Sequence, residues 1–181
     1  HATSTMGLPC RQAPIPPKPH YGLGSPARLR PATPRAIRLV PQPEDPMPKD
    51  RARKAYIDTP HGQVHVRMDG PDDGAPLLMV HWTPLSGRMY AAHLPLLADR
   101  GLRAIAVDLL GYGRSDPRPA DWSIEAWADN LADVLESLGI ARTALIGGHT
   151  GASVAAELAL RHPTRITRLV LDSCALPTPE L

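Results

Sequence analysis

Short apolar runs and longer amphipathic stretches alternate along the chain from Lys54 onward. The apolar runs predict strands at 54–59, 63–69, 76–81, 103–110, 143–148 and 166–172. The amphipathic stretches predict helices at 87–101, 123–140 and 151–162. The first two strands flank a short turn that contains Gly62 and are typical of a β-hairpin. The later strands alternate with helices, and parallel strands need such crossover connections. The sequence therefore predicts an α/β fold, a mostly parallel sheet with helices on both faces.

The predicted helix at 123–140 carries consistent signals at both ends. It begins at Ser123, has acidic residues in its first turns and ends at Gly139. One face is apolar and consists of Ile124, Trp127, Leu131, Val134, Leu135 and Leu138. The earlier helix ends on Gly101, which is also a suitable stop.

Residues 1–46 differ in composition from the rest of the chain. They hold half of the 22 prolines, several arginines and almost no acids before Glu44. Because each proline removes a backbone donor and restricts its neighbour, we expect a disordered Pro/Arg-rich tail, followed by a folded domain at 47–181. Three origins are open for the tail: a flexible basic segment, a transit-type peptide, or translated sequence upstream of the true start. We favour the last, because the chain begins with His1 and Met47 opens the fold-like part.

Composition and charge narrow the possible partners. The chain has 181 residues and 43% apolar content, which is ordinary for one globular domain. Its formal charge is +2, and the basic excess precedes residue 40, so neither a nucleic acid nor a membrane partner is expected. Cys10 and Cys174 lie far apart, which indicates no disulfide framework and fits a reducing cytoplasm. No apolar run approaches the roughly 20 residues that cross a bilayer, and no secretory signal opens the chain. Nothing in the sequence indicates an oligomeric state.

Four loops that follow predicted strands are the places to look for chemistry, because ligands of open α/β sheets bind beyond the carboxyl ends of the strands. Their sequences are VHWTPLSGRMY, VDLLGYGRSDP, IGGHTGA and LDSCALP. In this order they resemble the α/β-hydrolase superfamily, in which a His-Gly-x-Pro oxyanion loop, an Asp-x-x-Gly-x-Gly-x-Ser segment and a Gly-x-Ser-x-Gly nucleophile elbow follow successive strands. Residues 55–177 fit that order without a gap. The resemblance implies the N-terminal portion of an α/β-hydrolase fold, with histidine in place of the nucleophilic serine.

The frame of the third motif decides which residue stands at the apex of the elbow. The frame GGHTG places His149 there, and the frame GHTGA would place Thr150 there. We choose His149 because Pro163, in a His-Pro pair, lies fourteen residues later, as in family members. Gly147 and Gly151 also supply the small residues that the strained turn needs on either side. Two roles stay open for His149: nucleophile or general base, or an inert or binding role in a scaffold that has lost hydrolysis.

The resemblance also assigns an oxyanion hole. Its donors would be the backbone N–H groups of Thr83 and of Thr150, the residue after the apex. Trp82 stands where the family usually has glycine, so a bulky side chain is expected to narrow the substrate pocket. His81 is expected to pack against this loop rather than react. No cofactor is implied.

The second motif is predicted to be architectural. Gly111 and Gly113 allow a tight loop, and Asp108 is expected to tie it by hydrogen bonds. A dinucleotide site is not indicated, because the third glycine and an immediate helix are missing, and GGHTGAS lacks the lysine of a phosphate loop. His61 and His65 are expected to be surface or structural residues, and no cluster has metal-ligand spacing.

An α/β-hydrolase also needs an acid and a second histidine from later strands. Asp172 follows the last predicted strand, although that position more often serves the loop itself, and no histidine lies between it and Leu181. We therefore expect that this chain alone cannot assemble the full triad. The strand at 166–172 would present an open hydrogen-bonding edge, so the chain alone is expected to be poorly stable and prone to association.

Two functions follow from these observations. The first is a hydrolase that acts on a small ester, amide or related carbonyl substrate, which stays undefined because specificity comes from inserted loops. The second is a non-catalytic α/β-hydrolase-like protein that binds a small molecule or a partner in the retained cleft. A gene fragment with upstream sequence at its front is compatible with either, and the placement of an acid and a histidine further along the protein would discriminate between them.

Overall fold

The computed structural model describes residues 49–174, so the predicted tail and its boundary after residue 46 lie outside the described residues. The strands are β1 (Arg53–Thr59), β2 (Gly62–Asp69), β3 (Ala75–Val80), β4 (Leu102–Val107), β5 (Thr143–Gly148) and β6 (Ile166–Asp172). The helices are α1 (His93–Ala98), α2 (Ile124–Ser137) and α3 (Thr150–Arg161), with short 3₁₀ helices η1 (Gly87–Tyr90) and η2 (Pro163–Arg165). The predicted alternation of strands and helices is therefore present.

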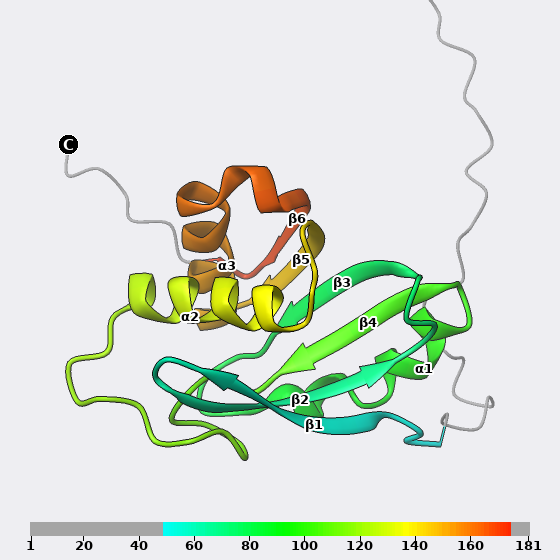
Figure 1. Cartoon of the computed structure of the whole chain (residues 1–181), viewed down its shortest axis with the longest axis horizontal. Coiled ribbons are helices and arrows are strands. Elements are labelled where there is room, and N and C mark those ends of the chain that lie inside the picture. Colours follow the sequence, from blue (N-terminus) through cyan, green and yellow to red (C-terminus); the bar gives the residue numbers. More distant parts are fainter. Residues whose placement is uncertain (1–48, 175–181) are drawn as a thin grey trace, which may run out of the picture. The chain divides into compact units, whose positions relative to one another are not determined.

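The strands form one twisted sheet in the order β1-β2-β4-β3-β5-β6 (Figure 1). The β1–β2 hairpin is antiparallel, and β2 joins β4 in antiparallel orientation, with Val66 opposite Val107. The β4–β3, β3–β5 and β5–β6 pairs are parallel. The sheet is thus mostly parallel, which confirms the predicted fold class, and the carboxyl ends of β3, β4, β5 and β6 share one edge.

Helices cover both faces of the sheet (Figure 1). Side chains alternate along each strand, so neighbours point to opposite faces. Leu78 and Val80 of β3 are fully buried in the core cluster that α2 and α3 close. Leu77 and Met79 belong to a smaller cluster on the other face, together with Leu94 of α1. Strand β3 is therefore buried on both faces, as its fully apolar sequence suggested.

The predicted helix at 87–101 is wrong as one continuous element, because η1 and α1 divide it. Ser86 caps η1, and α1 begins only at His93. Pro95 lies in the first turn of α1, where its missing N–H costs nothing, but inside a longer helix its ring would clash with the carbonyl four residues earlier. By contrast, the predicted start of α2 holds, since the hydroxyl of Ser123 accepts from the N–H of Ala126 at 3.3 Å.

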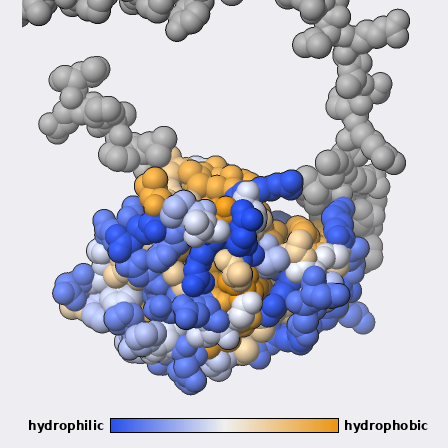
Figure 2. All heavy atoms as spheres, turned by 45° about the horizontal axis from the view of Figure 1, so that its top comes forward, coloured by the Kyte–Doolittle hydropathy of each residue, from blue (hydrophilic) through white to orange (hydrophobic). Residues whose placement is uncertain are grey.

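The two outer strands of the sheet differ in how much apolar surface they expose. On β6, Leu169, Val170 and Leu171 are 39%, 53% and 38% exposed. On β1, Tyr56 is the exposed large apolar residue, at 53%. Figure 2 shows that hydrophobic side chains gather on part of the surface and are not evenly scattered. Within the described sheet, β6 therefore has an open edge with exposed apolar residues.

Candidate functional site

His149 lies between the end of β5 and the start of α3, at the carboxyl edge of the sheet. Its backbone angles are φ 50° and ψ −116°, a region that residues with side chains rarely adopt. The backbone is held there from both sides: the N–H of His149 donates to the carbonyl of Asp172 at 2.8 Å, and its carbonyl accepts from Ala152 at 2.9 Å. Thr150 is already the first residue of α3. The strained position therefore belongs to the histidine.

Two glycines allow this turn to form. A Cβ on Gly147 would overlap the carbonyl oxygen of Gly151, and a Cβ on Gly151 would overlap the carbonyl oxygen of Val80. At these glycines the backbone of β5 contacts that of α3, and the backbone of α3 contacts the end of β3, with no side chain between them. Small residues are required two positions before and two positions after His149, the spacing that motivated the choice of frame.

The loop after β3 lies against this turn. A Cβ on Gly148 would overlap the indole Nε1 of Trp82, so the tryptophan packs directly on the end of β5 while staying 39% exposed. The hydroxyls of Thr83 and Thr150 are hydrogen-bonded at 2.8 Å. The structure therefore brings together Trp82, Thr83, His149 and Thr150, the four residues that the sequence analysis singled out.

The side chain of His149 is exposed and weakly held. Its Nδ1 lies 3.4 Å from the hydroxyl of Thr150, a long contact for a hydrogen bond. Over residues 49–174, the backbone N–H groups of Thr83 and Thr150 have no hydrogen-bond acceptor. The imidazole and two backbone donors thus keep hydrogen-bonding capacity available to a bound molecule.

Asp172 supports the turn through its backbone. Its carbonyl holds the N–H of His149, while its carboxylate accepts from the hydroxyl of Ser173 at 3.1 Å. No contact joins this carboxylate to the His149 ring in the described part of the chain.

Tyr90, which the sequence analysis missed, donates its hydroxyl to the carbonyl of Val80 at 3.0 Å. Burial, and next the charge of Asp172, raise the pKa of Tyr90 to about 12, so it stays neutral and anchors η1.

The loop after β4 is tied as predicted, by the buried Asp108. One carboxylate oxygen accepts from the N–H of Gly87 at 2.7 Å. The other accepts from the N–H of Arg114 at 2.9 Å and from Nδ1 of His65 at 3.0 Å. A Cβ on Gly113 would overlap this carboxylate, which explains the glycine. The motif is therefore architectural, and His65 is a buried structural residue.

His81 is also structural. Its Nδ1 donates to the carbonyl of Trp82 at 2.7 Å, and its Nε2 accepts from the N–H of Leu109 at 3.0 Å. Burial lowers the pKa of His81, although the hydrogen bond to Trp82 opposes this. The neutral ring joins the loops after β3 and β4.

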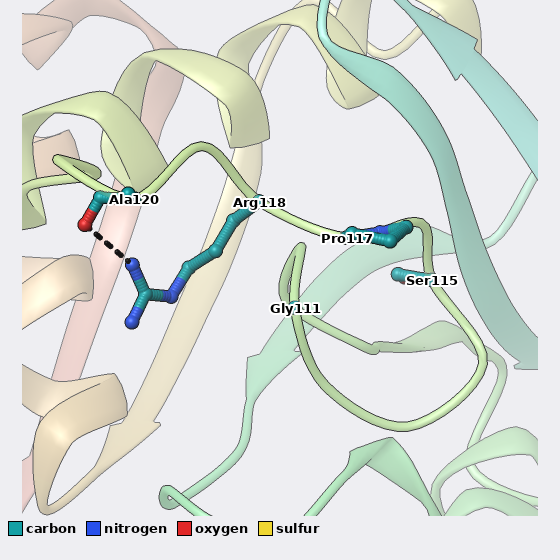
Figure 3. A pocket seen from close by; sticks show the side chains of 5 residues that line it. All are labelled: Gly111, Ser115, Pro117, Arg118 and Ala120. Carbon is teal, nitrogen blue, oxygen red and sulfur yellow. Dashed lines mark hydrogen bonds between the residues drawn. The ribbon is translucent and has the colours of Figure 1, made fainter.

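A cavity of about 600 Å³ lies beside the β4 loop and is lined by Gly111, Ser115, Pro117, Arg118 and Ala120 (Figure 3). The guanidinium of Arg118 bonds the carbonyl of Ala120 at 3.4 Å and lies 5.5 Å from the ring centre of Trp127. His149 does not line this cavity.

Between residues 49 and 174, no group of three His, Cys, Asp or Glu side chains could hold a metal ion. In the same part of the chain, no helix is long and apolar enough to cross a membrane.

The chain is similar to known proteins in sequence and in fold. A family model described as the alpha/beta hydrolase fold matches residues 75–181. The haloalkane dehalogenase of Mycobacterium marinum is 35% identical over 126 residues, which are 68% of this chain and 42% of that protein. The 2-hydroxymuconate semialdehyde hydrolase of a Pseudomonas species is 39% identical over 117 residues, 61% of this chain and 41% of that protein. A crystal structure of an N-acyl homoserine lactonase matches with a TM-score of 0.62 and 31% identity, covering 68% of this chain and 45% of that one. The chain thus spans less than half the length of the curated relatives it matches.

Proposed function

Because this chain belongs to the α/β-hydrolase fold family, we propose that the protein hydrolyses a small ester, amide or related carbonyl compound, with His149 at the apex of the turn between β5 and α3. Support comes from its relatives, which include a semialdehyde hydrolase and a homoserine lactonase. The substrate is a small molecule, and its identity depends on loops that vary within such folds.

The backbone of His149 is the observation that carries the proposal. A non-glycine residue with φ 50° costs about 1–3 kcal/mol, and such strain clusters at active sites. Here the strain presents an exposed imidazole at the edge of the sheet where α/β proteins bind ligands. A histidine that served only to connect β5 to α3 would be replaced by glycine without loss.

Neutral imidazole suits hydrolysis in either of two ways. As a general base, His149 takes a proton from water while the water oxygen bonds to the carbonyl carbon. The proton then passes to the leaving alkoxide or amine as its bond to carbon breaks. As a nucleophile, a ring nitrogen attacks that carbon first, and the bond to the leaving alkoxide or amine breaks as that group takes a proton from solvent. Water then cleaves the acyl–imidazole bond, which releases the acid and frees the ring. Both routes develop a negative charge on the carbonyl oxygen.

The N–H groups of Thr83 and Thr150 are proposed to stabilise that oxyanion. Both lack acceptors within residues 49–174, and the 2.8 Å bond between the two hydroxyls keeps the loop after β3 close to the start of α3. Loss of one such donor typically lowers the rate about 100- to 1000-fold. Trp82, packed on Gly148, is proposed to form one wall of the substrate pocket.

One observation favours a second function, ligand binding without catalysis. In the part of the chain that the structure describes, no carboxylate contacts the ring of His149, whereas catalytic histidines are usually oriented by one. If the rest of the protein supplies no such acid, the same cleft would bind a small molecule or a partner without hydrolysing it.

The deciding experiment measures hydrolysis of a panel of activated esters by the complete protein and by its His149→Ala variant. We expect the variant to lose about 100-fold or more in kcat/KM, the range of a lost general base. His93→Ala removes an exposed histidine from α1 and is the matched control, with no change expected. Equal rates for His149→Ala and the parent would remove His149 from the mechanism and favour the binding function. His149→Ser is a separate probe, since a gain in esterase activity would show that the scaffold stays competent.

A further inference from the structure

A second polar cavity lies on the face of the sheet opposite α2 and α3. It measures about 210 Å³. Three segments line it: β2, the start of η1, and the loop after β4. The titratable side chains in its lining are His65, Arg67, Arg88, Asp108 and Arg114. None of the residues proposed for hydrolysis lines it.

His65 lines the cavity and has one ring nitrogen without a partner among the described residues. The residue is 1% exposed, and its Nδ1 is 3.0 Å from the carboxylate of Asp108, an acceptor. Because the carboxylate accepts, Nδ1 carries a hydrogen. The other nitrogen, Nε2, is buried and has no hydrogen-bond partner within residues 49–174. A buried polar atom left in this way is destabilising, so a partner from outside the chain would be stabilising.

Positive charge exceeds negative charge around the cavity. Arg67 is 6% exposed and gives one bond, at 3.0 Å, to Asp50. The guanidinium groups of Arg88 and Arg114 have no hydrogen-bond or ion-pair partner on the described residues. Asp108 contributes the one carboxylate in the lining, and its two oxygens already accept three bonds. The cavity therefore has guanidinium donors to spare.

We propose that this cavity binds a phosphate group, either as the free ion or as a phosphate monoester. The oxygens of phosphate accept from guanidinium groups in charge-assisted bonds, which are stronger than neutral ones. Hydrogen phosphate also carries an O–H group, which donates to Nε2 of His65. Phosphate thus supplies both the acceptors for Arg88 and Arg114 and the donor for His65. The site goes beyond the proposed hydrolysis and does not depend on it.

The test is equilibrium dialysis of the full chain against radiolabelled inorganic phosphate at low ionic strength, with phenyl phosphate as a competitor. Saturable binding at one site per chain is expected. Arg88→Gln and Arg114→Gln should each weaken it about three- to tenfold, since each removes a charge-assisted donor that is partly screened by solvent. Neither side chain has a partner to lose among residues 49–174, so the fold should stay intact by circular dichroism.

Arg142→Gln is the matched control. It removes the same charge from an exposed arginine directly before β5, at the opposite edge of the sheet, and should leave phosphate binding unchanged. Stronger competition by phenyl phosphate than by unlabelled phosphate would assign the site to a monoester, and weaker competition would assign it to the free ion. Absence of saturable binding, or an equal loss in Arg142→Gln, would overturn the proposal. So would displacement of phosphate by chloride at the same concentration.

Discussion

The loops after β4 and β5 start at the same edge of the sheet, yet they use their polar side chains in opposite ways. After β4, the buried carboxylate of Asp108 accepts three hydrogen bonds from its own chain. After β5, the ring of His149 is exposed and, among the described residues, is held only by a 3.4 Å contact to Thr150. Position in the fold thus does not distinguish Asp108 from His149; the unmet hydrogen-bonding capacity of the His149 ring is what makes it the candidate for function.

The two loops also differ in which residues carry a positive φ angle. After β4, the positive φ angles of 87° and 58° fall on Gly111 and Gly113, which adopt them without strain. After β5, the positive φ of 50° falls on His149. A strained residue with an exposed, unsatisfied side chain is a functional candidate, because neither stability nor packing accounts for its presence.

The comparison predicts that Asp108→Ala has the largest effect on stability. The change leaves the buried N–H of Gly87, the N–H of Arg114 and the ring of His65 without their acceptor, and each buried group left unsatisfied costs about 1–3 kcal/mol. Urea denaturation measures the free energy of unfolding. Asp121→Ala, at an exposed position, is the control and should change it by less than about 0.5 kcal/mol. A loss below about 1 kcal/mol for Asp108→Ala would mean that the loop does not depend on this carboxylate.

The two edge strands give the next prediction. Val170 on β6 and Tyr56 on β1 are both 53% exposed, but Val170 has exposed apolar neighbours on either side. A lysine on an open edge opposes strand pairing, so Val170→Lys should lower the self-association constant of the chain about tenfold, or 1.4 kcal/mol. Tyr56→Lys should change it little. Sedimentation equilibrium distinguishes the two, and equal effects would show that association does not run through β6.

The sequence predicted β5 and β6 at their observed bounds, 143–148 and 166–172, because each is a short run rich in apolar residues. It also found the loops that follow the parallel strands, since the order of motifs along the chain determines them. The cavity around His65 was not predicted. It depends on the antiparallel pairing of β2 with β4, which brings His65 next to Asp108 from 43 residues away and leaves no local pattern.

The pH dependence of stability tests the loop after β3, which His81 joins to the loop after β4. Burial lowers the pKa of His81 in the folded chain from the ordinary value of 6.5. Below pH 6.5 the unfolded chain binds a proton that the folded chain does not, so the free energy of unfolding should fall as the pH drops from 6.5 towards the lowered pKa. The slope is at most about 1.4 kcal/mol per pH unit.

His81→Gln removes the titrating group and should flatten this part of the profile, while its side-chain oxygen can accept from the N–H of Leu109 in place of the imidazole. The measurement is urea denaturation of both proteins between pH 7.5 and about pH 5, the range where an ordinary histidine titrates. Parallel profiles would show that His81 is protonated in the folded chain, against the effect of its burial.

The smallest expected change in the free energy of unfolding is an increase, opposite in sign to the effect of Asp108→Ala. His149→Gly relieves a positive φ of 50° and should raise the free energy of unfolding by about 1 kcal/mol, although glycine gives back part of the gain through the entropy of the unfolded chain. His93→Gly, at the first residue of α1, removes a histidine from a helical backbone and should lower it by about 0.5–1 kcal/mol. If His149→Gly is also destabilising, then His149 contributes to the fold as Asp108 does. If it is stabilising and the complete protein loses hydrolysis, then the histidine is kept for its chemistry and at a cost to stability.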